Sequence, residues 1–490
     1  MCLYRDTPEA HGIPSDAILS MLRILDAYHL HTHSILLSRA DTVLAEAYYR
    51  PMHAGFQHRM YSTSKSFVAV AVGLAVTEGL FSLEDSIVSF FPEWRSEVND
   101  EYTDRCKVRD MLSMRSNVDG NVAWWGRFTD RITAYYSQRS NKLPGTLFKY
   151  DSIGSFLLGC IIERLTGRDF LSYMKDRVLR AIGFSEESFV LREPGGFAVG
   201  DSGVVCTARD LWLFARFIMK GGTWDGVSYI NPAFMREATS ALVPNSFSGD
   251  YALFNSSGYG YLIWRTHESG FALVGLGDQL AFCDEATDVC FVMTADNQAE
   301  RNVRQLIFHE FLYHLLPRVA KAPLPACESA YTALCEYLDT RRLVCVRGMA
   351  HTATEASVLG HEYRKSKGDT DVEGFCLTED VLYLTYRGVT YPFSFGRGEN
   401  VAARITLGTR AVATHMGLDE VGAYDGFTSA AWTDERTFSL MAQVTDTYFG
   451  SLCVHVGFDG EEASVHIVGS GQYVFGGIGG SFIARKVNKS

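Results

Sequence analysis

Two long apolar runs dominate the first half of the chain. Phe67–Val76 is apolar on almost every side, which is typical of a helix buried inside a large protein. Phe156–Leu165 is a second run of this kind, and Gly79 and Gly167 stand where the two helices would end. The pattern therefore predicts a mostly helical region between about residues 66 and 220, with these two helices in its core.

Runs rich in β-branched and aromatic residues flank that helical region. They cover Ser34–Ala47, Phe271–Leu276 and Gln279–Thr294, and a shorter run lies around Tyr259–Arg265. We expect them to form one antiparallel sheet, because strands of this kind bury one face against helices. The first part of the chain is thus predicted to be an α/β domain of three layers.

The pattern changes near residue 320. Residues 317–325 are rich in proline, and a helix is predicted from about Glu328 to Asp339. Beyond it, short runs rich in β-branched and aromatic residues are separated by turn clusters, which predicts an antiparallel sandwich or barrel. These runs are Val381–Tyr386, Thr390–Phe395, Phe438–Val444 and Leu452–Val456. A chain of 490 residues is too long for one compact core, so we expect two domains, 1–320 and 321–490.

Composition narrows the classes of partner. The formal net charge is −12, and we find no concentrated basic run, which disfavours nucleic acid and anionic membranes. The N-terminal residues lack a basic stretch followed by an apolar one, and no segment has the ~18 uninterrupted apolar residues of a membrane helix. Eleven dispersed cysteines without a C-x-x-C pair fit reduced thiols. We therefore expect a cytoplasmic protein without a membrane anchor; its oligomeric state stays open.

The candidate chemistry begins directly ahead of the first apolar run. Ser62 and Lys65 are three residues apart where a helix is predicted to begin, so they share a face. An amine beside a serine can take its proton, and the first helical turn offers unpaired N–H groups to a developing oxyanion. Ser172 and Lys175 have the same spacing but lie among charged residues, and we interpret them as the surface of a helix.

A second motif, Tyr150-Asp151-Ser152, precedes the other apolar run. With Ser62 and Lys65, it makes the chain resemble the penicillin-binding-protein and β-lactamase-like serine hydrolases, in particular the class C-type branch with esterases, D-aminopeptidases and amide hydrolases. The resemblance covers about residues 20–315. The further segments that carry it, in order, are Ala47–Pro51, Gly79–Asp85, Val108–Met114, Gly203–Leu211 and Gly258–Tyr261.

The resemblance implies a role for each matching residue. Ser62 would attack a carbonyl to form an acyl-enzyme, Lys65 would take its proton directly or through Tyr150, and Tyr150 would protonate the leaving group. Ser152 stands where relatives have Asn and would contact substrate. The oxyanion would meet the N–H of Ser62 and one from the strand between Gly275 and Gln279. No cofactor or metal is implied, and some relatives carry a lipocalin-like C-terminal barrel.

One segment departs from the family pattern. Relatives carry Lys-Thr-Gly or His-x-Gly on a strand that lines the site, but Leu273–Gln279 has neither Lys nor His. Gly275 and Gly277 remain where a substrate backbone must approach closely, and with Gln279 they are candidate substrate-binding residues. The missing cation argues against a substrate with a carboxylate, such as a β-lactam. His267 is a candidate substitute, although an exposed turn histidine is the simpler interpretation.

Three functions are consistent with these residues. The first is a serine hydrolase for a small amide, peptide or ester, which we favour. The second is a β-lactamase or DD-peptidase. The third is an inactive binding or sensor protein of the same fold. The first two require an activated Ser62, whereas the third does not.

Two histidine patterns could suggest metal sites, and we interpret neither as one. His29, His31 and His33 alternate, which fits a wet strand edge. His309 and His314 resemble a zinc-protease motif, but they are five residues apart. On an α-helix at about 100° per residue they would point about 140° apart and could not share an ion.

Overall fold

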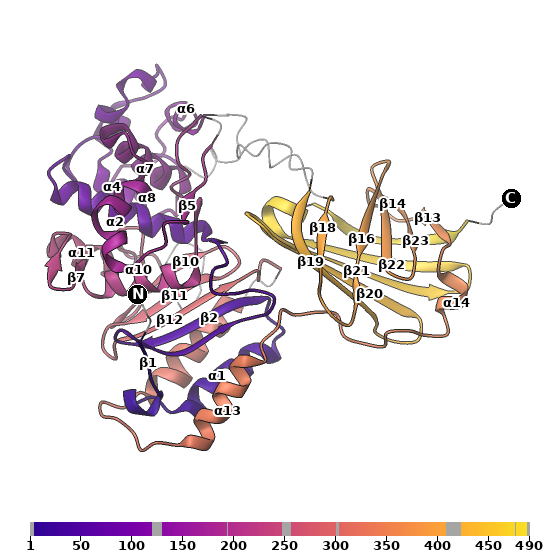
Figure 1. The fold of residues 1–490 in the computed structure, drawn as a ribbon. Coiled ribbons are helices and arrows are strands. Elements are labelled where there is room, and N and C mark those ends of the chain that lie inside the picture. The colour runs from indigo at the N-terminus through magenta and orange to yellow at the C-terminus, as the bar shows by residue number, and fades with distance from the viewer. Residues whose placement is uncertain are drawn as a thin grey trace. The chain divides into compact units, whose positions relative to one another are not determined.

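The chain forms two compact units, the first up to Arg342 and the second from Leu343 onwards, apart from a few residues on each side. The structure is a computed structural model that describes residues 4–119, 130–193, 195–246, 256–299, 303–407, 423–475 and 477–487. Figure 1 shows the helices and sheet of the first unit and the strands of the second.

The first unit is built on a seven-stranded sheet in the order β1-β3-β2-β12-β11-β10-β9. Neighbouring strands are antiparallel, except that β1 runs parallel to β3. The strands are β1 (Tyr4–Arg5), β2 (Thr32–Arg39), β3 (Thr42–Tyr48), β9 (Trp264–His267), β10 (Gly270–Gly275), β11 (Gln279–Asp284) and β12 (Val289–Ala295). The predicted antiparallel sheet is confirmed, although residues 259–263 form a turn ahead of β9 rather than part of it.

Helices cover this sheet on both faces (Figure 1). Those of the first unit are α1 (Ser15–Ala27), α2 (Ser64–Thr77), α3 (Glu101–Arg105), α4 (Val108–Leu112), α6 (Arg131–Tyr136), α7 (Ser152–Thr166), α8 (Phe170–Met174), α9 (Arg180–Ile182), α10 (Ala208–Met219), α11 (Pro232–Thr239), α12 (Val303–His309) and α13 (Glu328–Asp339). Short 3₁₀ turns are η1 (Glu9–His11), η2 (Tyr61–Thr63), η3 (Ile87–Phe90), η4 (Pro92–Trp94) and η7 (Leu316–Arg318). Two π-helices are η5 (Lys175–Leu179) and η6 (Glu310–Leu315). Small strand pairings outside the main sheet are β4 (His58–Arg59), β5 (Phe189–Val190), β6 (Val204–Cys206), β7 (Thr223–Trp224) and β8 (Val227–Ser228).

The alternation of side chains along the strands decides which helix packs where. Ser38 and Cys290 are cross-strand neighbours on one face, and Trp212 of α10 donates its indole N–H to Ser38 Oγ over 2.7 Å. Phe282 and Phe291 are cross-strand neighbours on the other face, and the ring of Phe311 in η6 lies 5.8 and 6.2 Å from theirs. The helices α10 and η6 therefore lie on opposite faces of the sheet.

The two central helices of the first unit belong to the α10 face. Phe67 of α2 stacks on Phe214 of α10 with ring centres 3.7 Å apart. Helices α2 and α7 pack together, and every residue from Phe67 to Ala75 is buried. The prediction of a helical region built around two buried helices is confirmed.

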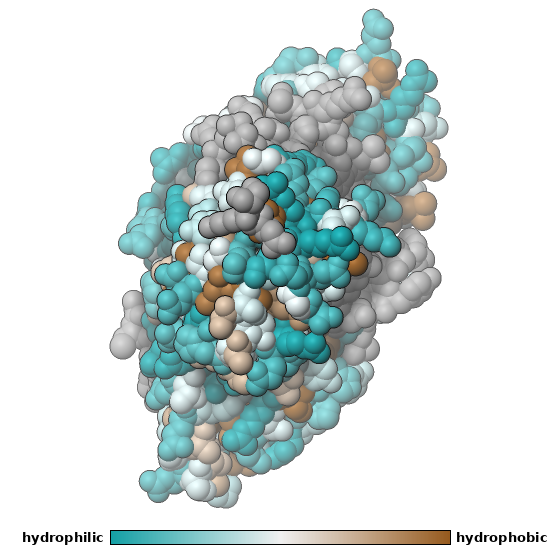
Figure 2. All heavy atoms as spheres, turned by 90° about the vertical axis from the view of Figure 1, so that its right-hand side faces the viewer, coloured by the Kyte–Doolittle hydropathy of each residue, from teal (hydrophilic) through white to brown (hydrophobic). Residues whose placement is uncertain are grey.

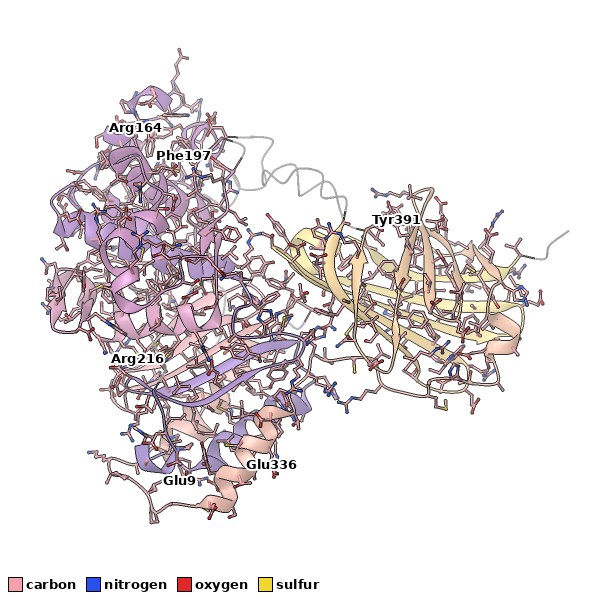
Figure 3. All side chains as sticks on the ribbon, in the orientation of Figure 1. Glu9, Arg164, Phe197, Arg216, Glu336 and Tyr391 are labelled. Carbon is pink, nitrogen blue, oxygen red and sulfur yellow. The ribbon has the colours of Figure 1, made fainter. Side chains whose placement is uncertain are left out.

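The division between the units falls later in the chain than the predicted 320/321. Helix α13 packs on α1, and the Tyr337 hydroxyl donates to Asp26, which also pairs with Arg341. Figure 3 labels Glu336 on α13 and Arg216 on α10, the helices on the two faces of the sheet. The proline-rich stretch marks a connection inside the first unit, because the helix after it returns to pack on that unit.

The second unit is one curved sheet. Within the described residues its strands are β13 (Glu362–Lys367), β14 (Val372–Leu377), β15 (Val381–Tyr386), β16 (Val389–Ser394), β17 (Gly396–Arg397), β18 (Val401–Ile405), β19 (Tyr424–Trp432), β20 (Thr437–Thr445), β21 (Phe449–Asp459), β22 (Glu462–Ser470) and β23 (Gly479–Lys486). Their order is β16-β15-β14-β13-β23-β22-β21-β20-β19-β17, with β18 also paired to β19. The described part of the unit also contains a short helix, α14 (Glu355–Val358), and a π-helix, η9 (Gly471–Phe475).

The two ends of this sheet approach each other. Strand β17 follows β16 directly in the chain but pairs with β19, and the Thr428 hydroxyl of β19 donates to the Ser394 carbonyl of β16. Trp432 is fully buried inside, with its ring 5.5 Å from Phe438 and 5.8 Å from Phe458. The predicted all-β second domain is confirmed as a nearly closed, barrel-like sheet, which is antiparallel except where β17 runs parallel to β19.

Hydrophilic side chains dominate the surface shown in Figure 2, and hydrophobic residues form small separate groups on it. Val389, Val468 and Ile483 are among the exposed large hydrophobic residues of the second unit. Within the described ranges, no helix combines the length and the apolar character that crossing a bilayer requires.

Candidate active site

Ser62 and Lys65 lie together at the start of the buried helix. Ser62 is in the 3₁₀ turn η2, which continues directly into α2, and Lys65 is one turn further on. Lys65 Nζ lies 3.1 Å from Ser62 Oγ and donates to the Asp201 carbonyl over 2.9 Å. Lys65 is only 1% exposed, whereas Ser62 is partly accessible. The predicted pair of hydroxyl and amine is therefore formed.

The other hydroxyls of this segment anchor it to three parts of the unit. Thr63 Oγ1 donates to the Gln279 carbonyl over 2.8 Å, and Ser66 Oγ donates to the Leu262 carbonyl over 2.9 Å. Ser64 Oγ accepts the Val204 N–H over 3.0 Å. Each bond fixes the start of α2 against a different element, so the position of Ser62 is determined by long-range contacts.

The residue ahead of Ser62 has an unusual backbone conformation. Tyr61 has a φ of 44°, a left-handed value that is uncommon for an aromatic residue. Its ring is covered by the guanidinium of Arg59 at 4.7 Å, and both residues are buried. Arg59 in turn donates from Nε to the Ser202 carbonyl over 2.9 Å. This packing holds the strained turn that presents Ser62.

Asp201 connects Lys65 to a buried arginine. Its carbonyl accepts from Lys65, and its carboxylate pairs with Arg131 over 3.1 Å. Arg131 also lies over the ring of Phe156 at 5.0 Å and pairs with Glu193 over 3.3 Å. Burial raises the pKa of Glu193 to about 8. Asp201 and Arg131 could not be predicted from the sequence, because each is a single charged residue that belongs to no motif.

Tyr150 lies beside the amine of Lys65. Lys65 Nζ is 5.1 Å from the centre of the Tyr150 ring. The ring stacks on Trp264 with centres 5.4 Å apart and meets Tyr259 edge-on at 6.5 Å. Burial, with a smaller contribution from Tyr150, holds the pKa of Tyr259 well above its ordinary value. The structure therefore brings all three predicted catalytic residues into one cluster.

The segment after Tyr150 starts helix α7. Asp151 is its N-cap and accepts the Ile153 N–H over 2.8 Å and the Ser116 hydroxyl over 3.1 Å. Burial raises the pKa of the Asp151 carboxyl. Ser152 is the first residue of α7 and is half-buried, next in sequence to Tyr150. Asp151 thus has a structural role, and Ser152 stays a candidate for substrate contact.

The hairpin between β10 and β11 closely approaches the segment that carries Ser62. A Cβ on Gly275 would stand 2.3 Å from the Met60 carbonyl, so only glycine fits there. Gly275 pairs with Gln279, and the turn between them contains Gly277 at a φ of 74°. Gly275 is therefore required by the close approach to Met60, whereas Gly277 is required by the turn.

The side chain of Gln279 has a structural role, which corrects its prediction as a substrate contact. Its amide donates to the Leu276 carbonyl over 2.9 Å and to the Ala295 carbonyl over 2.7 Å, and the residue is 0% exposed. Sequence reasoning also missed Arg304, which donates to the Gly275 carbonyl over 2.9 Å and pairs with Asp278 over 2.7 Å. Gln279 and Arg304 hold the hairpin from its two sides.

Two backbone donors flank the contact between Gly275 and Met60. Among the described residues, neither the N–H of Ser62 nor that of Leu276 donates a hydrogen bond. Strand β9 pairs with β10 only as far as Ala272, so the edge of β10 from Leu273 to Gly275 is not covered by it. Both N–H groups are therefore candidate donors to a carbonyl oxygen brought to Ser62.

Two other candidates from the sequence, the pair Ser172 and Lys175 and the substitute cation His267, do not resemble or join this cluster. Ser172 Oγ donates to the Asp169 carboxylate over 2.7 Å, while Lys175 Nζ donates to the carbonyls of Glu186 and Ser188. This serine and lysine therefore do not pair with each other. His267 pairs with Asp284 over 2.9 Å at the end of β10 remote from Gly275, so it does not replace the missing cation.

His33, near the start of β2, is buried and does not lie at a wet strand edge, which corrects the expectation from the sequence. His33 is 2% exposed, and its Nδ1 lies 2.8 Å from Nε2 of His58, which is 1% exposed. His58 Nδ1 lies 3.0 Å from the Arg59 carbonyl and must donate to it, so His58 Nε2 accepts from His33. Burial lowers the pKa of His58 to about 3 and that of His31 to about 4.

The chain is similar to several known proteins. A model of the family described as Beta-lactamase matches residues 21–309. The 6-aminohexanoate-dimer hydrolase of Paenarthrobacter ureafaciens is 25% identical over 318 residues, which cover 58% of this chain and 78% of that protein. Esterase EstB of Burkholderia gladioli is 25% identical over 183 residues, covering 34% of this chain and 46% of the esterase. The octameric penicillin-binding protein homologue from Pyrococcus abyssi is 14% identical with a TM-score of 0.47, covering 96% of this chain and 99% of that one.

Proposed function

The chain belongs to the Beta-lactamase family, and on that premise we propose that it is a serine hydrolase that cleaves a small amide, peptide or ester through an acyl-enzyme. The observation that carries the proposal is the 3.1 Å approach of Lys65 Nζ to Ser62 Oγ at the mouth of a buried helix. An amine so placed can accept the serine proton, which is the requirement for an activated hydroxyl nucleophile.

The cluster supports one assignment of roles. Ser62 Oγ attacks the substrate carbonyl while its proton passes to Lys65, directly or through Tyr150. Tyr150, beside the Lys65 amine, delivers a proton to the leaving amine or alkoxide. Water then hydrolyses the acyl-enzyme, with its proton taken by the same pair, and Ser62 is restored.

We assign the developing oxyanion to two backbone donors, the N–H groups of Ser62 and Leu276. The Gly275 contact with Met60 places the hairpin against the segment that carries Ser62. The anchoring bond from Thr63 to the Gln279 carbonyl connects the same two segments. Donors fixed in this way need no reorganisation as negative charge develops on the substrate oxygen.

The substrate class follows from the residues of the hairpin. Residues 273–279 offer no lysine or histidine to grip a carboxylate, and the nearby Arg304 is already paired with Asp278. This favours a neutral amide or ester over a β-lactam. Two relatives are named 6-aminohexanoate-dimer hydrolase and Esterase EstB, which supports an amide or ester bond as the target; the aminohexanoate dimer ends in a carboxylate, so only the hairpin residues argue for a neutral substrate.

A substrate panel tests the proposal. The purified chain is assayed with p-nitrophenyl esters, a linear amide dimer and the chromogenic cephalosporin nitrocefin, beside Ser62→Ala and the matched Ser172→Ala. We expect hydrolysis of an ester or amide that disappears in Ser62→Ala and persists in Ser172→Ala. Hydrolysis that survives in Ser62→Ala would refute the assignment of the nucleophile. Faster turnover of nitrocefin than of any ester or amide would refute the assignment of the substrate class.

A further inference from the structure

The helix after the last strand of the first sheet changes its winding at Glu310. Helix α12 ends at His309, and the π-helix η6 continues from Glu310 to Leu315. In a π-helix, hydrogen bonds join residues five apart, so such residues lie one above the other. His309 and His314 are five apart, and their ring centres are 5.2 Å from each other.

This winding overturns the expectation that the two histidines point apart. The value of about 140° assumes α-helical geometry throughout residues 309–314. The extra residue in the π turn brings the second imidazole back to the side of the first. Single π turns of this kind are frequent at functional sites, because they re-aim side chains without ending the helix.

Glu310 lies between the two histidines. Its Oε1 is 3.3 Å from His309 Nδ1 and 3.8 Å from His314 Nε2. Glu310 is 4% exposed, and its second oxygen, Oε2, is buried with no hydrogen-bond partner among the described residues. A carboxylate oxygen buried without a donor is unfavourable unless a cation or a metal compensates it.

We propose that His309, Glu310 and His314 form a binding site for a divalent transition-metal ion, with Zn²⁺ as the best match. One ligand atom from each residue lies within 4.8 Å of the other two, so a small closure of the side chains would bring all three onto one ion. Two imidazole nitrogens and a carboxylate oxygen form a donor set that zinc uses with water in its fourth position. The side chains of His309 and His314 are 48% and 55% exposed, which leaves that position open to solvent.

The packing around the site supports a fixed geometry. Phe308 and Phe311, on either side of the His309–Glu310 pair, pack their rings 5.1 and 5.8 Å from Phe282 of the sheet. The backbone that carries the ligands is therefore anchored by buried aromatic residues. Because η6 lies on the face of the sheet opposite α10 and α2, the metal site is separate from Ser62 and does not depend on the proposed hydrolase activity.

The test is a titration of the full chain, freed of metal by a chelator, with Zn²⁺ alone and with Co²⁺ alone. Isothermal calorimetry gives the stoichiometry, and the visible absorption of Co²⁺ reports a site of low coordination number. The variants are His309→Ala, His314→Ala and Glu310→Gln. The matched control is His351→Ala, which removes a histidine that pairs with Glu355 at 2.9 Å but, in the part of the chain that the structure describes, belongs to no group of three possible metal ligands.

We expect a high-affinity Zn²⁺ site in the wild type and in His351→Ala that weakens by about tenfold or more in each of the other variants. Since His309 and His314 are exposed, their removal leaves the fold intact, which thermal unfolding without metal verifies. Equal Zn²⁺ affinity in all proteins would overturn the proposal, as would the lack of any binding in the wild type. In either case the histidines would be no more than ion-pair partners of Glu310.

Discussion

Lys65 Nζ lies 3.1 Å from Ser62 Oγ, and this distance distinguishes the pair from the other serine and lysine with the same spacing. Lys65 is 1% exposed, and its amine also donates to the Asp201 carbonyl and lies 5.1 Å from the centre of the Tyr150 ring. Lys175 instead donates to two backbone carbonyls, and Ser172 donates to Asp169. An S-x-x-K spacing thus acquires chemical meaning only through burial and the partners of the amine.

Replacing Lys65 by methionine should remove the acceptor of the serine proton while keeping the volume of the side chain. We expect kcat/KM for the best ester to fall by about 10²- to 10⁴-fold, the usual contribution of a general base. Steady-state kinetics measure the loss, and Lys175→Met serves as the matched control with wild-type rates. An active Lys65→Met enzyme would contradict the role of the amine.

Replacing Tyr150 by phenylalanine keeps the stacking on Trp264 but removes the hydroxyl to which we assign the proton transfer. We expect kcat to fall by about 10²-fold or more with little change in KM, since the hydroxyl acts in the transition state. Tyr229→Phe, in which the altered ring packs on Phe217 away from the cluster, is the control. A rise of KM at constant kcat would instead assign Tyr150 to substrate binding.

Replacing Gly275 by alanine should displace the hairpin from the segment that carries Ser62. The new Cβ would meet the Met60 carbonyl at 2.3 Å, and a backbone atom can yield only by moving the strand. We expect a loss of about 1–3 kcal/mol of unfolding free energy and a fall in kcat. Chemical denaturation and kinetics measure both, and Gly55→Ala, whose nearest neighbour would be 3.5 Å away, should change neither. Full activity in Gly275→Ala would show that the hairpin does not position the oxyanion donors.

Acid should destabilise the chain through its buried histidines. Burial lowers the pKa of His58 to about 3, so between about pH 6.5 and 3 the unfolded chain binds a proton that the folded chain does not. The stabilisation is complete above pH 6.5 and is lost as the pH falls, by about 1.4 kcal/mol per pH unit for one proton. Denaturant titrations from pH 7 to 4 should show a shallower slope in His58→Gln and an unchanged slope in His53→Ala. Equal slopes in His58→Gln and the wild type would mean that His58 does not couple folding to pH.

Much of the fold could be predicted because the pattern and the packing agree. The apolar runs after Ser62 and Tyr150 form α2 and α7, and the strand-like runs of the second half form a curved sheet. The boundary between the units could not be placed from the sequence, because the proline-rich stretch around residue 323 indicates only a break in local structure. Whether the helix after it belongs to the first unit depends on a long-range contact, the one between Tyr337 and Asp26.

The candidate site could be predicted only in part for a similar reason. Spacing along one helix brings Ser62 and Lys65 together, but nothing in the sequence indicates that Asp201 accepts from the same amine. The inward direction of Gln279 depends on the tight hairpin, and the approach of His309 to His314 depends on a π turn. Predictions that assume ideal helices and strands do not anticipate a tight hairpin or a π turn.

The most direct test of the central claim is covalent labelling of Ser62. The purified chain is incubated with a fluorophosphonate probe beside Ser62→Ala and Ser172→Ala, and the adduct is located by intact mass and peptide mapping. We predict one adduct, on Ser62, that forms in the wild type and in Ser172→Ala and is absent from Ser62→Ala. An unlabelled wild type, or an adduct that persists in Ser62→Ala, would contradict an activated serine at this position.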